Sequence, residues 1–155
     1  MIEKFTDDYS FLSNFYPCVV RFGVQLWDDE VLQDQYYPSA EHAYQAAKAT
    51  NREDRKRIRL CRHANQAKKL GRQIRCRKDW EQVKYALMLD IVADKFTRNP
   101  ELTRKLVLTK DVAIIENNWW HDRYWGKCLC PKCGGTGENK LGEILMLVRS
   151  KIRGD

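Results

Sequence analysis

A long amphipathic segment, Asp79–Thr97, constrains the fold of this chain more than any other feature of the sequence. Its apolar residues recur at steps of three and four, which is the spacing of one face of an α-helix: Trp80, Val83, Leu87, Ile91, Ala93 and Phe96. Asp79 is expected to cap this helix, and the dipeptide Asn99-Pro100 to end it. The segment 139–152 carries a second such stripe, formed by Leu141, Ile144, Leu145, Val148 and Ile152. The two stripes predict a mainly helical protein.

Shorter elements complete the predicted architecture. The segments CVVRFG (18–23) and EVLQDQYYP (30–38) have the composition of strands, and VAIIE (112–116) is predicted to be a buried strand. Further helices are expected after Ser39 as N-cap, in one or two pieces between Asn51 and Gly71 with Gly71 as the stop, and from Pro100. The 155 residues, 43% of them hydrophobic, suffice for one domain, 1–155, of the α+β class, mostly helical with a small β-sheet.

Composition restricts the cellular compartment of the protein and the charge of its partner. No run of about 18 apolar residues is present, so no membrane span is expected. The N-terminus lacks the pattern of a signal peptide, and the six cysteines are therefore expected to be free or metal-bound thiols in a reducing cytoplasm. The net charge of +7 favours an anionic partner. The basic excess gathers in residues 51–78, which form either a solvated helical surface or a flank that attracts phosphate.

The most unusual stretch is PSAEHAYQAAK (38–48), which is predicted to be helical. One face of this helix carries Glu41, Tyr44, Gln45 and Lys48, and the other side is rich in alanine. A surface pair of Glu41 with Lys48 is one interpretation, but the two lie two turns apart, beyond the usual contact between exposed residues. If the face is buried, the two charged groups must be paired or have shifted pKa values. The face is therefore a candidate active-site surface.

Two aromatic segments are further candidates. In IIENNWWHDRYWG (114–126) the tryptophans either staple a loop to the core or form a slot for a flat ring. Asp122 is a candidate carboxylate there, while His121 is expected to be a structural hydrogen-bonding group and not a base. In FLSNFYPC (11–18), Asn14 could offer an amide to a base or ribose while Phe15 stacks on it. The alternative is a loop whose aromatic residues enter the core.

A cysteine cluster follows. Cys128, Cys130 and Cys133 give the pattern C-x-C-x-x-C, typical of half a zinc ribbon, but the second ligand pair is missing. One of Cys18, Cys61, His63, Cys76 or His121 could complete a site only if the chain folded back. The sequence therefore favours a Gly-rich hairpin with reduced thiols, without a metal or any cofactor, and leaves zinc as the alternative. The turn GGTGEN, which follows, is a candidate phosphate-binding site.

Four motifs in order, FLSNFYP, YPSAEHAYQAAK, WWHDRYWG and GENKLGEILMLVR, closely resemble the NADAR family of YbiA-like N-glycosidases, from about Phe5 to Arg149. The resemblance implies a mainly helical α+β fold and cleavage of bonds between a ribose carbon and a nitrogen base or amine. It associates two substrate classes with the chain: ADP-ribose attached to guanine in DNA or RNA, and phosphoribosylamino intermediates of riboflavin synthesis. The functional residues that it implies are Asn14, Glu41, Gln45, Lys48, Trp119, Asp122, Trp125, Gly126, Asn139 and Gly142.

The same resemblance implies a Schiff base on Lys48, and the chemistry of the residues agrees with it. A buried lysine amine can lose its proton near neutral pH and attack an aldehyde carbon, with Glu41 or Asp122 moving protons. Phe15 and Tyr44 join the expected substrate-binding residues. Two rival interpretations remain: a non-catalytic module that binds ADP-ribose or nucleic acid, and a zinc-stabilised interaction domain.

Overall fold

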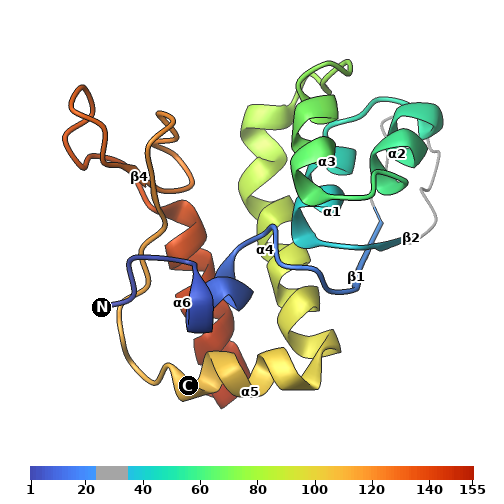
Figure 1. The fold of residues 1–155 in the computed structure, drawn as a ribbon. Coiled ribbons are helices and arrows are strands. Elements are labelled where there is room, and N and C mark those ends of the chain that lie inside the picture. The colour runs from blue at the N-terminus through green and yellow to red at the C-terminus, as the bar shows by residue number, and fades with distance from the viewer. Residues whose placement is uncertain (24–34) are drawn as a thin grey trace. The chain divides into compact units, whose positions relative to one another are not determined.

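The computed structural model describes residues 1–23 and 35–155 and divides into two compact units (Figure 1). One unit consists of Met1–Ser13 and Pro100–Asp155, and the other of Asn14–Asn99. We call them the terminal unit and the central unit. The fold class is α+β and mostly helical, as predicted. The strands of the described residues form two separate two-stranded sheets.

The central unit is built around one short helix. Strands β1 (Val20–Phe22) and β2 (Gln35–Tyr37) pair antiparallel, and helices α1 (Ala40–Ala47), α2 (Arg52–Arg59), α3 (Ala64–Gly71) and α4 (Trp80–Arg98) follow. Helix α1 contacts the other three helices and both strands. The first part of the predicted second strand, residues 30–34, lies outside the described residues. The expected helical region 51–71 forms two helices, and Gly71 ends the second.

Local hydrogen bonds explain where α1 begins. Ser39 is its N-cap, as predicted, because the Ser39 hydroxyl accepts from the backbone N–H of His42 at 3.1 Å. Ser39 Oγ also lies 2.6 Å from His42 Nδ1, and His42 Nε2 lies 2.9 Å from the carbonyl of Cys61. Burial lowers the pKa of His42, so the neutral ring is favoured. This histidine joins the start of α1 to the connection between α2 and α3.

Helix α4 confirms the predicted position of the long helix but not its predicted cap. Asp79 occupies the N-cap position, yet its side chain makes no capping hydrogen bond within the described part of the chain. Its carboxylate instead accepts two bonds from the Arg77 guanidinium, at 2.6 and 3.0 Å. Two charge-assisted hydrogen bonds from a guanidinium bind the carboxylate more strongly than one hydrogen bond from a backbone N–H. Near the other end of α4, Lys95 is only 1% exposed, and burial lowers its pKa to about 8.

The terminal unit contains the 3-10 helix η1 (Asp7–Leu12), helices α5 (Pro100–Leu108) and α6 (Lys140–Arg153), and the parallel strands β3 (Asn117–Asn118) and β4 (Lys127–Cys128). Helices α5 and α6 pack together. Four residues of the predicted α6 stripe are buried: Leu141, Ile144, Leu145 and Val148. Ile152 is partly exposed.

The prediction of a strand at residues 112–116 is wrong. Ile114 is fully buried but forms only an isolated bridge, to Ile2. Its neighbours Ala113 and Ile115 each share one backbone hydrogen bond of 2.8 Å with Ile2. These two hydrogen bonds both involve Ile2, so Ile114 is buried here without a continuous ladder of strand hydrogen bonds. None of the helices in residues 1–23 and 35–155 has the length and apolar character needed to cross a bilayer.

Candidate active site

The polar face of α1 points into the central unit. Glu41, Tyr44 and Gln45 are 6%, 8% and 3% exposed, and all eight residues of the helix are buried. The carboxylate oxygen Oε1 of Glu41 accepts a hydrogen bond of 2.7 Å from Gln45 Nε2. The interpretation of Glu41 and Lys48 as an exposed surface pair is therefore wrong. A buried carboxylate bonded to a buried carboxamide is a prearranged polar group.

Lys48 follows α1 directly, at its C-cap, and reaches into an aromatic corner. Its Nζ lies 5.4 Å from the centre of the Tyr44 ring and 5.8 Å from that of Trp80, and the two rings are 5.2 Å apart. Burial is the main cause that lowers the pKa of Lys48, although the charge of Glu41 opposes it. Compared with an exposed lysine, a larger fraction of Lys48 is therefore the neutral, nucleophilic amine at any given pH.

Asn14, from the FLSNFYP motif, lies at the start of α1. The carbonyl of Asn14 accepts from the backbone N–H of Glu41 at 2.9 Å, which satisfies a first-turn donor of the helix. The side chain of Asn14 is 9% exposed, and its Nδ2 lies 3.5 Å from the sulfur of Met88. The next residue, Phe15, is 39% exposed, with Lys68 Nζ 5.7 Å from its ring centre. Asn14 is thus adjacent to Glu41, and Phe15 offers an open aromatic surface.

Gly71 has a role that the sequence did not reveal. A Cβ at this position would overlap Gln45 Oε1, so the end of α3 can approach α1 only because residue 71 has no side chain. Gln45 Oε1 is buried and has no hydrogen-bond partner among the described residues. The end of α3 thus lies against the carboxamide of Gln45, whose Nε2 donates to Glu41. Two residues in contact across helices leave no local sequence signal.

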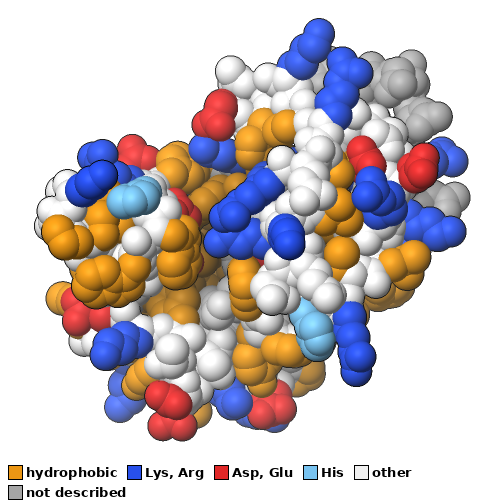
Figure 2. Space-filling model, turned by 45° about the horizontal axis from the view of Figure 1, so that its top comes forward, with side chains coloured by type: hydrophobic (Ala, Val, Ile, Leu, Met, Phe, Trp, Pro, Cys, Tyr) orange, Lys and Arg blue, Asp and Glu red, His pale blue; other side chains and the backbone are white. Residues whose placement is uncertain are grey.

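A groove of about 750 Å³ runs beside the Lys48 backbone. The carbonyl of Lys48 accepts from Arg77 N at 2.8 Å, and Ala49 forms a bridge with Cys76, which lines the groove. The full lining is Thr50, Arg75, Cys76, Arg77, Lys78, Asp79 and Gln82. Asp79 offsets the charge of Arg77, whereas Arg75 and Lys78 are exposed. Figure 2 shows Lys and Arg side chains at several places on the displayed face of this unit. The groove can attract an anion.

In the terminal unit, Asp122 organises its own loop. Its Oδ1 accepts from the backbone N–H groups of Tyr124 and Trp125, at 3.1 and 2.9 Å. Trp119 and Trp120 are 64% and 56% exposed, so these two tryptophans do not anchor the loop in a hydrophobic core. The Trp125 ring packs edge-on against Tyr124, with 4.7 Å between ring centres. Asp122 therefore holds the backbone of its own loop, and the side chain of Trp119 is exposed.

Asn118 also holds this loop and was missed by the sequence analysis. It is 1% exposed, its Oδ1 accepts from the N–H groups of Trp120 and Asp122, and its Nδ2 donates to the carbonyl of Asp122 at 2.7 Å. An asparagine directly before two tryptophans was the available signal. Gly126 lies beside it, where a Cβ would overlap the carbonyl of Glu116. Both residues let the loop close on itself.

Asn139 and Gly142 fasten the start of α6. Asn139 adopts a left-handed conformation with φ of 55°. Its Oδ1 accepts from Glu116 N at 2.9 Å, and its Nδ2 donates to the Ile114 carbonyl at 3.0 Å. A Cβ on Gly142 would overlap the same carbonyl. Both residues are thus in contact with the backbone of residues 114–116, and their expected substrate contacts stay a prediction.

The predicted site residues thus form two groups. The central unit brings together Asn14, Phe15, Glu41, Tyr44, Gln45 and Lys48 on or beside α1. The terminal unit brings together Trp119, Asp122, Trp125, Gly126, Asn139 and Gly142 between β3 and the first turn of α6. Lys48, the candidate nucleophile, and the candidate carboxylate Glu41 belong to the first group.

Comparison with known proteins defines the class. The NADAR domain model matches residues 2–153, and the chain belongs to this family. An N-glycosidase YbiA of Escherichia coli is 30% identical over 95% of this chain and 84% of its own length. An N-glycosidase of Nostoc punctiforme is 32% identical, over 97% and 90%. A riboflavin biosynthesis protein of Vibrio vulnificus is 32% identical, but this chain spans only 36% of its length.

A solved structure supports the same grouping. The NMR structure of the E. coli protein YbiA matches 98% of this chain and 83% of that chain, with a TM-score of 0.74 and 28% sequence identity. The fold predicted from the resemblance is thereby confirmed.

Proposed function

We propose that this protein is an N-glycosidase that cleaves the bond between a ribosyl carbon and a nitrogen base or amine, with Lys48 as covalent catalyst. The observation that carries the proposal is the environment of the Lys48 amine: an aromatic corner in which burial lowers its pKa, beside a buried Glu41–Gln45 pair. The names of the relatives from E. coli and Nostoc punctiforme support the reaction class.

The proposed reaction starts with opening of the ribose ring. The ring oxygen takes a proton, its bond to C1 breaks, and C1 and the leaving nitrogen form an iminium. Neutral Lys48 Nζ adds to C1, the leaving nitrogen is protonated, and its bond to C1 breaks, which leaves a Schiff base between Lys48 and the sugar. Water then adds to C1, the bond from C1 to Lys48 Nζ breaks, and the sugar is released as its aldehyde while the lysine amine is regenerated. One water is consumed and one base or amine is released.

Glu41 is the proposed proton carrier in these steps. Its Oε1 is held by Gln45 Nε2, and its charge acts on Lys48, so it is near the amine whose proton must move. Asp122 was an equal candidate from sequence, but its Oδ1 already holds two backbone N–H groups. We therefore assign Asp122 a positioning role. Stacking of a base on Phe15, Trp119 or Trp125 stays a prediction.

The groove beside Lys48 supplies the proposed phosphate contacts. Arg75 and Lys78 are exposed there, while Arg77 is paired with Asp79. Both candidate substrate classes carry phosphate on the ribose side: ADP-ribose on guanine in nucleic acid, and a phosphoribosylamine of riboflavin biosynthesis. The name of the Vibrio relative favours the second class. The concentrated basic charge of residues 51–78 suits the first.

Incubation with both substrates tests the proposal. The wild-type protein is expected to release free sugar from at least one of them, and Lys48→Ala and Lys48→Arg to release none while still binding it. Arginine keeps the charge but stays protonated and cannot attack C1. Lys69→Arg, at an exposed position of α3, is the matched control and should react as the wild type does. Cleavage by Lys48→Arg at the wild-type rate would refute covalent catalysis, and binding without any cleavage by the wild type would indicate a binding module.

A further inference from the structure

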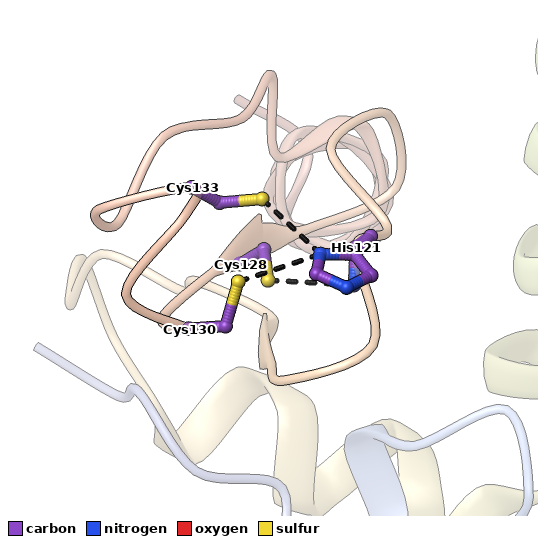
Figure 3. Close-up of side chains that lie close together, drawn as sticks. All are labelled: His121, Cys128, Cys130 and Cys133. Atoms are coloured by element: carbon purple, nitrogen blue, oxygen red, sulfur yellow. Dashed lines mark hydrogen bonds between the residues drawn. The ribbon is translucent and has the colours of Figure 1, made fainter.

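Four potential metal ligands converge in the terminal unit. Cys128, Cys130 and Cys133 direct their sulfur atoms toward the imidazole of His121 (Figure 3), and the four ligand atoms lie within 4.8 Å of one another. Nδ1 of His121 lies 3.4 Å from the sulfur of Cys130 and 3.4 Å from that of Cys133. We propose that these four residues hold one structural Zn²⁺ ion.

The distances match a shared cation. With Zn–S bonds of about 2.3 Å and a Zn–N bond of about 2.0–2.1 Å, a tetrahedral ion sets nitrogen and sulfur ligands about 3.6 Å apart. The two nitrogen–sulfur distances of 3.4 Å are near this value. Hydrogen bonding alone explains the arrangement poorly, because Nδ1 has either one lone pair or one proton and cannot serve two thiols equally. A cation at the centre satisfies all four ligands at once.

Backbone turns bring the sulfur atoms to one point. The carbonyl of Cys130 accepts from the N–H groups of Cys133 and Gly134, at 3.1 and 2.9 Å, and that of Cys128 accepts from Gly135 at 2.8 Å. Gly134 and Gly135 have φ of 61° and 80°, which glycine adopts without strain. The sulfur of Cys128 additionally accepts from His121 N at 3.3 Å. Such an N–H contact orients a thiolate ligand from outside the metal shell.

The fourth ligand answers the objection that the sequence raised. A zinc site was disfavoured there because the second ligand pair of a zinc ribbon is missing. His121 precedes the cysteines in the chain, and the loop between them folds back so that a single histidine completes the set. Three thiolates and one imidazole select Zn²⁺ among the common divalent ions. Four protein ligands leave no coordination position open for water or substrate. Such a closed ligand set is typical of a structural zinc site and not of a catalytic one.

The ion would fix the loop that carries the aromatic candidates. His121 has φ of 69°, a left-handed conformation that is unfavourable for a residue with a side chain. Ligation through Nδ1 would hold this conformation and, with it, the adjacent Asp122 and the exposed Trp119. The zinc site therefore belongs to the architecture of the loop and is independent of whether Lys48 is the nucleophile.

Metal analysis of the full chain, purified under reducing conditions without chelator, tests the proposal. We expect about one zinc per chain, and Co²⁺ in its place should give the intense charge-transfer and visible bands of a tetrahedral thiolate site. Cys133→Ser should lose most of the metal, whereas Cys76→Ser, at an exposed cysteine outside the cluster, should keep it. His121→Cys should also keep it, because it replaces one zinc ligand by another.

Three results would overturn the inference. The first is wild-type protein without zinc that also gives no Co²⁺ spectrum. The second is a disulfide between two of the three cysteines in freshly purified protein. The third is equal zinc in Cys133→Ser and wild type. The wild-type Co²⁺ spectrum does not depend on any variant, so it remains decisive if Cys133→Ser fails to fold.

Discussion

Replacing Gly71 by alanine tests whether the end of α3 fixes the Gln45–Glu41 pair. The new Cβ would overlap Gln45 Oε1, so either α3 moves or the carboxamide turns away from Glu41. Overpacking of a core costs about 1–3 kcal/mol, and loss of the hydrogen bond costs about 1 kcal/mol. Alanine in a helix returns about 0.5–1 kcal/mol relative to glycine. We expect a net loss of about 1–3.5 kcal/mol in the free energy of unfolding.

A double-mutant cycle measured by urea denaturation separates this clash from other effects of the substitution. In a Gln45→Ala background the overlapping carboxamide is gone, although the remaining Cβ of residue 45 still lies 3.1 Å from the added one. Most of the destabilisation by Gly71→Ala should then disappear, which is a coupling energy of about 1–3 kcal/mol. Equal effects in the two backgrounds, or a Gly71→Ala protein as stable as the wild type, would refute the reasoning.

Three further predictions concern the central unit. Glu41→Gln should bind substrate normally but cleave it about 100-fold more slowly, because it removes a positioned proton carrier; an unchanged single-turnover rate would exclude that role. Burial holds the pKa of Lys95 at about 8, below 10.5, so the unfolded chain binds more protons between these pH values and the free energy of unfolding should rise with pH there. Lys95→Met should make that rise smaller, because the contribution of Lys48 then remains, and an unchanged rise in the variant would contradict the assignment. Arg75→Gln combined with Lys78→Gln should raise the KM of a phosphorylated substrate and flatten its dependence on salt; an unchanged KM would remove the groove from the site.

The polar face of α1 was the part of the site that could best be predicted from sequence. A polar stripe opposite alanines is a local pattern, and its burial follows because small residues allow neighbours to approach closely. The contacts of Glu41 with Gln45 and of Lys48 with Tyr44 come from residues on the same helix or at its end. The helical stripes of α4 and α6 were predictable for the same reason.

Contacts between distant segments escaped prediction. Gly71 looked like a helix stop, and nothing local indicates that it touches Gln45. Residues 112–116 have the apolar composition of a strand, but whether a buried segment forms a ladder depends on its partner, and among the described residues it forms only an isolated bridge, to Ile2. His121 could be recognised as the missing ligand only after the chain had folded back on the cysteines.

Trapping of the reaction intermediate tests the central claim most directly. Borohydride added during turnover reduces a Schiff base to a stable amine, so the sugar should stay covalently attached to the protein. Peptide mapping by mass spectrometry should place the adduct on Lys48 and find none on the buried amine of Lys95 or in the Lys48→Arg protein. Rapid cleavage with no trapped sugar, or an adduct on another lysine, would contradict Lys48 as the nucleophile and would favour direct action of Glu41 on an oxocarbenium ion.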